Sequence, residues 1–397
     1  MSSLPKLFIN IGNLKISLIV SLSDEQDRFE VLEKLVLPIE GINKSRITDL
    51  EKIANLIKKN ILIIEQKVNY TFKDVIIVLN NFETSFINLC GYKKLNGTQI
   101  SKGNITYILN SLKSCVDEFE KSKKILHIFN SEYCLDKKKL DNLPIGLFGD
   151  FYSHELSFGL INKHDYKNLE NIFKRCNLKI KKLLLESFVK GSLINDNNPE
   201  ITTFFYIQID NKSSKIFYFE NTALKFEQKF NFGTEIIEND ISKITSLEIG
   251  AVKSIISENK DIYKILDKEL LEEKYFINQK YRKIKKNLIA KIAEARIDEL
   301  SEKFFLKNIN LNNLSKENLI ILLEINNQHH YSCFNHAFEK SFAFKNKNNL
   351  KIVKKPKIEQ VIKKADNIVE FGWKREVIPV FKENISFITR IFRSIFS

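Results

Sequence analysis

The stretch that decides the fold is Leu7–Ser21, LFINIGNLKISLIVS, in which the pair Gly12-Asn13 separates two apolar runs. β-Branched and large apolar residues on both sides of such a pair are typical of a β-hairpin. A helix is predicted next, over Ile47–Val68, because its apolar residues recur at helical spacing. Asp74–Leu79 (DVIIVL) has the composition of a buried strand. The order strand, turn, strand, helix, strand predicts a layered α/β domain.

The second half of the chain repeats this order. Thr202–Ile209 (TTFFYIQI) and Lys215–Phe219 (KIFYF) predict two strands that open it. Helices are predicted at Ile237–Asn259 and across the charged span Asp261–Lys307, and Leu319–Ile325 (LIILLEI) predicts another buried strand. Two halves that each begin with strand, turn, strand indicate a duplicated architecture.

Other stretches interrupt or follow the repeated pattern. Thr84–Leu160 indicates a small inserted subdomain with a helix at Asn104–Glu120. Tyr166–Arg175 and Leu178–Leu185 then predict a helix and a strand that return to the α/β pattern. After Phe344 the chain becomes a Lys-rich stretch, Lys345–Lys364, which we expect to be a connector.

Length and composition restrict the possible classes of protein. A chain of 397 residues is long enough for two or more domains with their own cores. Its formal charge of +14 comes mostly from dispersed Lys, and it permits an anionic membrane surface or nucleic acid without showing either. We predict no nucleic-acid binding, because no aromatic and basic residues form a platform.

The cysteines and the apolar runs indicate the compartment. The five cysteines form no Cys-x-x-Cys pair, which is typical of a reducing cytosol. No apolar run reaches the ~18 residues of a spanning helix. We therefore expect a soluble, cytosolic body.

Phe381–Ser397 has the pattern of a short amphipathic helix. From Asn384 onward, Ile and Phe recur at three- and four-residue spacing, with Arg on the flanks. Such a helix is ~20 Å long and cannot span a ~30 Å hydrocarbon core. The residues alone permit either a helix docked on its own domain or one that lies in a membrane interface. In the second interpretation the membrane-binding residues are Ile385, Ile388, Arg390, Ile391, Phe392, Arg393, Ile395 and Phe396.

This organisation resembles the actin/Hsp70 superfamily and, within it, the bacterial cell-division family FtsA. Asn10–Asn13 matches the turn Asp-Ile-Gly-Thr of the first hairpin, and Gln208–Lys215 stands where the family has Asp-Ile-Gly-Gly-Gly-Thr-Thr-Asp. Phe232–Ile241 is similar to the family's Val-Gly-Gly-x-x-Ile-Thr-x-Asp-Ile, and Ala295–Leu300 is similar to its Arg-x-x-Glu-Leu helix. The amphipathic terminal segment matches the family's membrane-targeting element.

The resemblance implies an α/β fold of the actin-like, ribonuclease H-like type, duplicated, with an inserted subdomain in each half and a C-terminal amphipathic helix. The implied parts are a first core (1–83 with 162–198), a first insertion (84–161), a second core (199–236 with 316–344), an FtsZ-binding second insertion (237–315), a basic linker (345–380) and a membrane-binding helix (381–397).

The nucleotide site implied by the resemblance is degenerate. Superfamily members hold Mg²⁺ with one Asp in each hairpin, and the counterparts here are Asn10 and Gln208. A carboxamide lacks the charge that Mg²⁺ requires, so ATP and Mg²⁺ remain possible cofactors, but we expect no ATP hydrolysis and no catalytic residue. The implied nucleotide-binding residues are Asn10, Gly12, Asn13, Lys15, Gln208, Asn211, Lys212, Gly233, Lys253, Asn326 and Asn327. The His- and Cys-containing stretch Gln328–His336 matches no standard zinc spacing, and we predict no metal site there.

The resemblance also implies partners. The second insertion of FtsA-like proteins binds the C-terminal peptide of the tubulin homologue FtsZ, and the residues that correspond here are Asn239, Asp240, Arg296, Glu299 and Lys303. From the residues alone, Arg296, Glu299 and Lys303 could equally form a local salt-bridge string on one helix.

The function implied is a peripheral protein at the division septum, on the cytoplasmic face of the inner membrane. It would tether FtsZ filaments to that anionic surface, help to assemble the Z ring, associate with itself and contact other division proteins. The alternatives are an active ATPase of the same superfamily and a pilus-assembly actin homologue.

Overall fold

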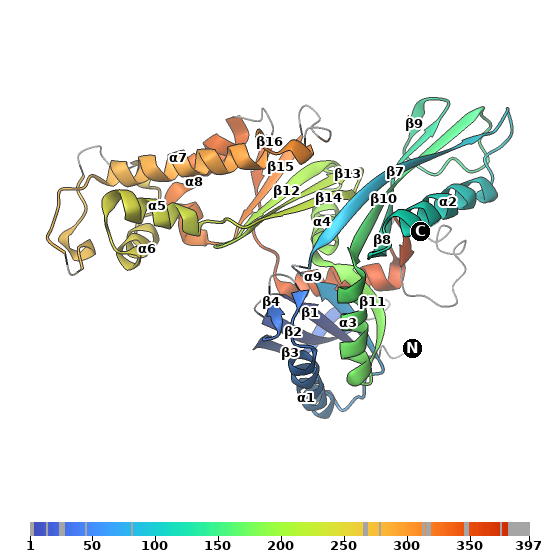
Figure 1. Cartoon of the computed structure of the whole chain (residues 1–397), viewed down its shortest axis with the longest axis horizontal. Helices are drawn as coiled ribbons and strands as arrows, with labels where there is room; N and C mark the ends of the chain where they lie inside the picture. Colours follow the sequence, from blue (N-terminus) through green and yellow to red (C-terminus); the bar gives the residue numbers. More distant parts are fainter. Residues whose placement is uncertain are drawn as a thin grey trace. The chain divides into compact units, whose positions relative to one another are not determined.

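The computed structural model describes residues 4–12, 15–23, 28–43, 46–80, 82–264, 269–277, 279–311, 314, 319–344, 349–373 and 375–379. The chain divides into two compact units (Figure 1). The first comprises Met1–Thr202, Phe219–Phe226 and Pro356–Ser397, and the second comprises Thr203–Tyr218 and Glu227–Lys355.

The core of the first unit is a five-stranded sheet with the order β11-β6-β1-β2-β3. The predicted hairpin is confirmed: β1 and β2 are antiparallel, with Lys6 opposite Ser21 and Ile11 opposite Ile16. The predicted helix is confirmed as α1, which begins after the N-cap Asp49, whose carboxylate accepts from the Lys52 N–H. The bounds are β1 Lys6–Ile11, β2 Lys15–Ser23, β3 Phe29–Pro38, β4 Ile42–Asn43, β5 Arg46–Ile47, α1 Leu50–Val68, β6 Asp74–Leu79, α3 Lys163–Arg175, β11 Lys179–Leu185, α4 Glu186–Asn197 and α9 Ile358–Phe371.

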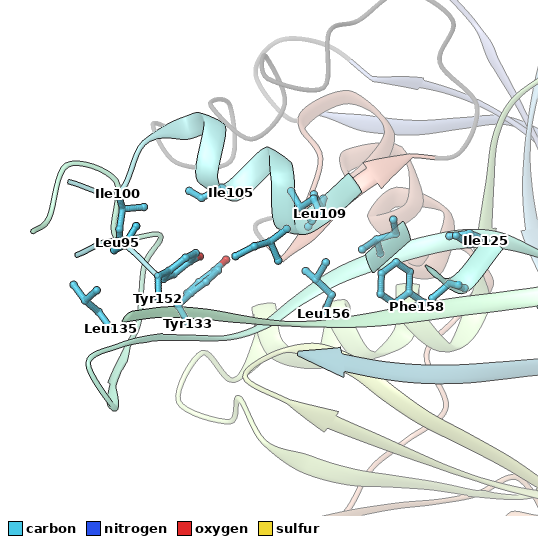
Figure 2. Close-up of a cluster of buried hydrophobic side chains, with 14 of the residues drawn as sticks. Leu95, Ile100, Ile105, Leu109, Ile125, Tyr133, Leu135, Tyr152, Leu156 and Phe158 are labelled. Atoms are coloured by element: carbon cyan, nitrogen blue, oxygen red, sulfur yellow. The ribbon is translucent and has the colours of Figure 1, made fainter. Parts of the chain in front are cut away.

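A second sheet is formed by strands of the chain segment between β6 and α3, together with the later strand β17. Its strand order is β17-β8-β10-β7, with β9 paired to β8, and α2 lies along one face. Figure 2 shows the core between this helix and the sheet, including Leu109 of α2 and Tyr152 and Phe158 of β10. We call this part the inserted sheet. Its elements are β7 Thr84–Lys94, α2 Lys102–Phe119, β8 Lys123–Leu135, β9 Lys138–Leu140, β10 Phe151–Asn162 and β17 Glu376–Pro379.

The second unit contains a five-stranded sheet with the order β14-β13-β12-β15-β16. In this sheet β12, β15 and β16 are parallel neighbours, as the buried apolar runs of β12 and β15 favour. The tip of the β13–β14 hairpin belongs to the first unit, where the Ser157 hydroxyl donates to the Leu224 carbonyl at 2.8 Å. The bounds are β12 Phe204–Ile209, β13 Ser214–Glu220, β14 Ala223–Phe230, α5 Glu235–Thr245, α6 Ile249–Glu258, η1 Ile262–Lys264, η2 Glu273–Tyr275, α7 Lys286–Phe304, η3 Ile309–Leu311, β15 Ile320–Ile325, α8 Gln328–Phe344 and β16 Asn349–Ile352.

The structure differs from the sequence-based expectations in three stretches. The single helix expected over Ile237–Asn259 is two helices, because Ser246 adopts a left-handed conformation with φ of 53° and ends α5. The charged span 261–307 contains two short 3₁₀ turns before α7, instead of continuous helix. The stretch 345–380, expected as a basic linker, contains β16, α9 and β17.

A buried ionic triad fixes β17 to the first unit. Glu376 of β17 accepts from His127 Nδ1 of β8 at 2.7 Å and pairs with the Lys182 ammonium of β11 at 2.8 Å. The Leu185 N–H donates to His127 Nε2, so the proton of this imidazole resides on Nδ1. Burial raises the pKa of Glu376, but the Lys182 charge and the His127 hydrogen bond outweigh it and hold this pKa at about 2. Because all three side chains are buried, His127 and Lys182 both depend on Glu376 for their buried partner.

We predict that Glu376→Gln lowers the free energy of unfolding by about 3–5 kcal/mol at pH 7, since it leaves Lys182 buried without its counter-charge. The pKa of Glu376 is depressed in the folded state, so its stabilisation is complete above the ordinary value of 4.5 and disappears as pH falls towards about 2. Urea denaturation at several pH values should show the difference between wild type and variant shrinking over that range. Glu370→Gln is the matched control, because the side chain of Glu370 is 38% exposed where it pairs with Lys6 and Lys181, and we expect the change to cost less than about 1 kcal/mol.

Candidate functional site

The polar residue of the first hairpin is engaged within its own unit. Asn10, which replaces the expected Asp, is buried on β1, and its Nδ2 donates to Glu186 Oε2 at 3.1 Å. The other oxygen of Glu186 pairs with the Lys190 ammonium one helical turn further along α4, at 2.8 Å. At the turn itself the Gly12 N–H donates to the Lys15 carbonyl at 3.0 Å. The Glu186 carboxylate that accepts from Asn10 therefore already has a lysine counter-charge.

The second hairpin turn is also occupied by protein groups. The N–H groups of Thr234 and Glu235, at the start of α5, donate to the carbonyls of Asp210 and Asn211 at 3.0 and 2.9 Å. The N–H groups at the N-terminus of a helix are those that would otherwise bind a phosphate. Gly233 permits this contact, because a Cβ there would lie 2.0 Å from the Asp210 carbonyl oxygen. The Asp210 carboxylate in turn accepts from the side-chain amide of Asn326.

Gln208 lies in a buried network of the second unit. Its Nε2 donates to the Tyr206 hydroxyl at 2.9 Å and to Glu324 Oε1 at 3.1 Å, and the same hydroxyl bonds to the other oxygen of Glu324. In both units the side-chain amide at the position where the resemblance implies an Asp thus donates to a neighbouring carboxylate. An amide can do this, whereas a second carboxylate would meet a like charge.

Among the remaining residues of the expected nucleotide site, Asn327 joins the second hairpin turn. Lys15 and Lys212 are exposed, in different units. The Nζ atom of Lys253, on α6, lies 3.7 Å from Oε2 of Glu238. The other oxygen of this carboxylate, Oε1, lies 3.2 Å from Nε2 of His330. Asn327 Nδ2 donates to Asn211 Oδ1 at 3.3 Å. Asn13 lies outside the described residues.

The residues expected to bind FtsZ come together where α5 faces α7. Arg296 donates from Nε to Asp240 of α5 and from Nη1 to Glu299 Oε2 at 2.5 Å, and the other oxygen of Glu299 pairs with Lys303 at 2.8 Å. The predicted salt-bridge string is confirmed, and Asp240 extends it to a second helix. The pKa of Glu299 lies below its ordinary value, chiefly because Lys303 donates a hydrogen bond to its carboxylate. Asn239 is exposed beside this cluster, which we call the α5–α7 cluster.

The described residues were also compared with the expectations about metal-ion sites and membrane contact. Within the described ranges, no group of three or more His, Cys, Asp and Glu side chains is arranged to hold a metal ion. None of the described helices is long and apolar enough to cross a membrane. The amphipathic segment with Ile385, Ile388, Arg390, Ile391, Phe392, Arg393, Ile395 and Phe396 lies outside the described residues.

Sequence reasoning missed the residues that accept hydrogen bonds from Asn10 and Gln208. Glu186 and Lys190 stand at i and i+4 on α4, a spacing that predicts an ion pair, but nothing in the sequence indicates that it is buried against Asn10. Glu324 is the one charged residue in the apolar run LIILLEI, and a lone carboxylate in a buried strand is the signal that could have pointed to Gln208.

Sequence comparisons show that the chain is similar to cell division proteins named FtsA. No family model matches it. It is 22% identical to the cell division protein FtsA of Buchnera aphidicola subsp. Baizongia pistaciae over 298 residues, which cover 74% of this chain and 69% of that protein. It is 18% identical to FtsA of Escherichia coli K12 over 235 residues, 59% of this chain and 55% of that protein.

Among solved structures, the chain is similar to one from a PilM–PilN type IV pilus biogenesis complex. The TM-score is 0.54 with 9% identity, and the match covers 92% of this chain and 98% of the other. The structure therefore has the actin-like fold that the sequence predicts.

We predict that Asn10→Asp lowers the free energy of unfolding by roughly 3 kcal/mol at pH 7.5, because it exchanges a hydrogen bond to Glu186 for a second buried carboxylate. The loss should shrink at pH 5, where one proton shared by the two carboxyl groups relieves the repulsion. Urea denaturation measures both values. Asn171→Asp, the same change at an exposed position of α3, should stay within about 0.5 kcal/mol of wild type.

The same titrations with ATP and Mg²⁺ test whether the wild-type site still binds nucleotide. A ligand that binds only the folded chain raises its unfolding midpoint. We expect no Mg²⁺-dependent rise, and a clear one would contradict our expectation of a degenerate site.

Proposed function

We propose that this chain is an FtsA-like actin-fold protein that tethers FtsZ filaments to the cytoplasmic membrane at the site of cell division. The observation that carries the proposal is the sequence similarity to FtsA proteins, which extends over 298 residues and 74% of this chain. The actin-like fold is compatible with this proposal and equally with the pilus-assembly alternative. Cell division is thus the process in which we place the chain.

The α5–α7 cluster is the surface that we assign to the FtsZ C-terminal peptide. Arg296 holds α7 against α5 through Asp240, and its guanidinium remains partly exposed between two carboxylates. Just beyond α7, Leu306 and Ile309 are 63% and 82% exposed and offer apolar contacts to a bound peptide. A half-exposed charged cluster beside apolar side chains suits a short peptide that carries both kinds of residue.

We further infer that this tether works without ATP hydrolysis. Asn10 and Gln208 donate to carboxylates of their own units, and the first N–H groups of α5 are bonded to the second hairpin turn. The active-ATPase alternative requires these groups to face Mg²⁺ and phosphate instead. The pilus-assembly alternative shares the fold but predicts no FtsZ binding, so the FtsZ experiment below separates it from our proposal.

The membrane contact is assigned to Phe381–Ser397. In the first unit, β17 ends at Pro379, five residues before the start of the expected helix at Asn384. The membrane anchor would therefore begin close to the end of β17. One such amphipathic helix binds a bilayer weakly, and alignment of many chains along an FtsZ filament multiplies the weak anchors into firm attachment.

We predict that Phe392→Glu reduces co-sedimentation with vesicles that contain anionic phosphatidylglycerol at least about tenfold, because a charge on the apolar face opposes burial in the interface. The control is Phe119→Glu, which makes the same change at a side chain that is 80% exposed at the end of α2. Removal of residues 384–397 should abolish the binding that Phe392→Glu weakens. Vesicle binding that survives this truncation would refute the membrane assignment.

We predict that Arg296→Glu weakens binding of an FtsZ C-terminal peptide at least about tenfold, since it places three carboxylates together and opens the contact between α5 and α7. Fluorescence anisotropy with a labelled peptide measures the affinity. Lys291→Ala, an exposed position on the same helix, should leave it unchanged. Equal affinity for wild type and Arg296→Glu would remove the α5–α7 cluster from the proposed interface.

A further inference from the structure

One edge of the five-stranded sheet in the first unit carries three exposed cations. β1 and β11 both pair in parallel with β6, so these three strands begin at the same edge. Lys73 directly precedes β6, and Lys174 and Arg175 end α3, which only a short turn separates from β11. All three side chains are exposed, and no carboxylate of the described residues pairs with any of them. These cations are therefore available to an anionic partner.

The last residue of α9 places an aromatic side chain at the same edge. Glu370 pairs with Lys6 of β1 and with Lys181 of β11, both at 3.2 Å, so the end of α9 lies beside the beginnings of these strands. Phe371 is the next residue, and its side chain is 72% exposed. Leu4, two residues before β1, is 63% exposed. We call the exposed residues of this edge the strand-start surface: Leu4, Lys73, Lys174, Arg175 and Phe371.

Exposed cations beside protruding apolar side chains are the combination that binds an anionic bilayer. The cations attract the headgroups, and each cation held near such a surface raises the affinity about fivefold. Phe and Leu side chains enter the boundary between headgroups and acyl chains, where they leave water. A charged face that only meets water gains nothing from the exposure of Phe371 and Leu4.

A docked helix fits the strand-start surface less well than a bilayer does. An amphipathic helix that docks on a protein fills a groove with a row of apolar side chains at positions i, i+3, i+4 and i+7. Leu4 and Phe371 come from two separate elements and form no such row. A bilayer requires no groove, because its headgroups and acyl chains adapt to single side chains. The chemistry therefore favours lipid as the partner.

The position of the strand-start surface in the chain connects it with the proposed anchor. After α9 the chain forms β17, whose Glu376 pairs with Lys182 of β11 at 2.8 Å. β11 thus begins at the strand-start surface and also holds the last strand before the anchor. Asn384, where the expected helix begins, follows Phe371 by thirteen positions. The surface and the anchor therefore belong to neighbouring parts of the same unit.

We propose that the strand-start surface is a second membrane contact, which meets anionic headgroups once the terminal helix has brought the chain to the bilayer. The contact is too small to hold the chain without that helix, and it determines which side of the first unit faces the membrane. This inference rests on the membrane assignment proposed above and goes beyond it, since a terminal helix on a short segment does not by itself orient the unit.

Tryptophan fluorescence on the full chain tests the contact directly. The chain has one tryptophan, Trp373, which is buried, so Phe371→Trp adds a single exposed reporter and wild type sets the baseline. Phosphatidylglycerol vesicles with brominated acyl chains should quench the added emission, because the reporter enters the acyl boundary. Phe119→Trp is the matched control at a side chain that is 80% exposed on α2, and its emission should not be quenched.

Removal of charge tests the cations. The double change Lys174→Gln and Arg175→Gln should weaken binding of the full chain to these vesicles at least about fivefold, and the difference should shrink in high salt. Lys163→Gln with Lys167→Gln is the matched control, because it removes the same charge from exposed positions near the start of α3. Those positions lie roughly 10–18 Å further along the helix, beyond a Debye length of about 8 Å.

The outcomes separate the strand-start surface from the anchor. A chain that binds vesicles while the emission of Phe371→Trp stays unquenched would overturn the second contact and leave the terminal helix as the anchor. A chain that does not bind vesicles at all would overturn both. Equal losses in the two charge variants would assign the effect to net charge and remove the surface. Emission of Phe371→Trp that is shielded from iodide without vesicles, until residues 384–397 are removed, would identify the tail as the occupant and also overturn the proposal.

Discussion

The first unit depends on the buried contact between Glu376, His127 and Lys182. These residues come from β17, β8 and β11, so the contact joins the inserted sheet to the five-stranded sheet of the same unit. Breaking a buried ion pair leaves an uncompensated charge at a cost of several kcal/mol, which makes the three strands interdependent. The triad therefore fixes the segment after α9 to the inserted sheet and determines where the chain leaves β17.

In the two hairpins the constraint is that every buried polar group needs a hydrogen-bond partner. Both hairpins have the strands of the actin-like fold, and their polar groups bond to other groups of the same unit. Asn10 donates to Glu186, Gln208 donates to Glu324, and the N–H groups that begin α5 bond to the second turn. A buried polar group must find a partner, and in both hairpins the protein itself supplies that partner. The apolar strands determine the fold, so polar side chains at their ends can change their partners without changing the fold.

Sequence patterns predicted the parts of this structure that depend on local periodicity. The hairpin β1–β2, the helix α1 and the buried strands β6 and β15 follow from apolar runs and helical spacing. The break at Ser246 was missed because a left-handed serine carries no marker such as glycine. β17 was missed because it has four residues, and its burial depends on Glu376 meeting His127, 249 positions earlier in the chain. The contact of Asn10 with Glu186 was missed for the same reason, since a contact between residues 176 positions apart leaves no local pattern.

The proposed membrane anchor would follow from the inserted sheet of the first unit. β17 is an outer strand of that sheet, it is held by the buried triad, and it ends at Pro379, five residues before the expected helix begins at Asn384. One amphipathic helix binds a bilayer weakly, so a single chain would attach only transiently. Chains aligned along one filament would combine their weak anchors, because the affinities of linked contacts combine.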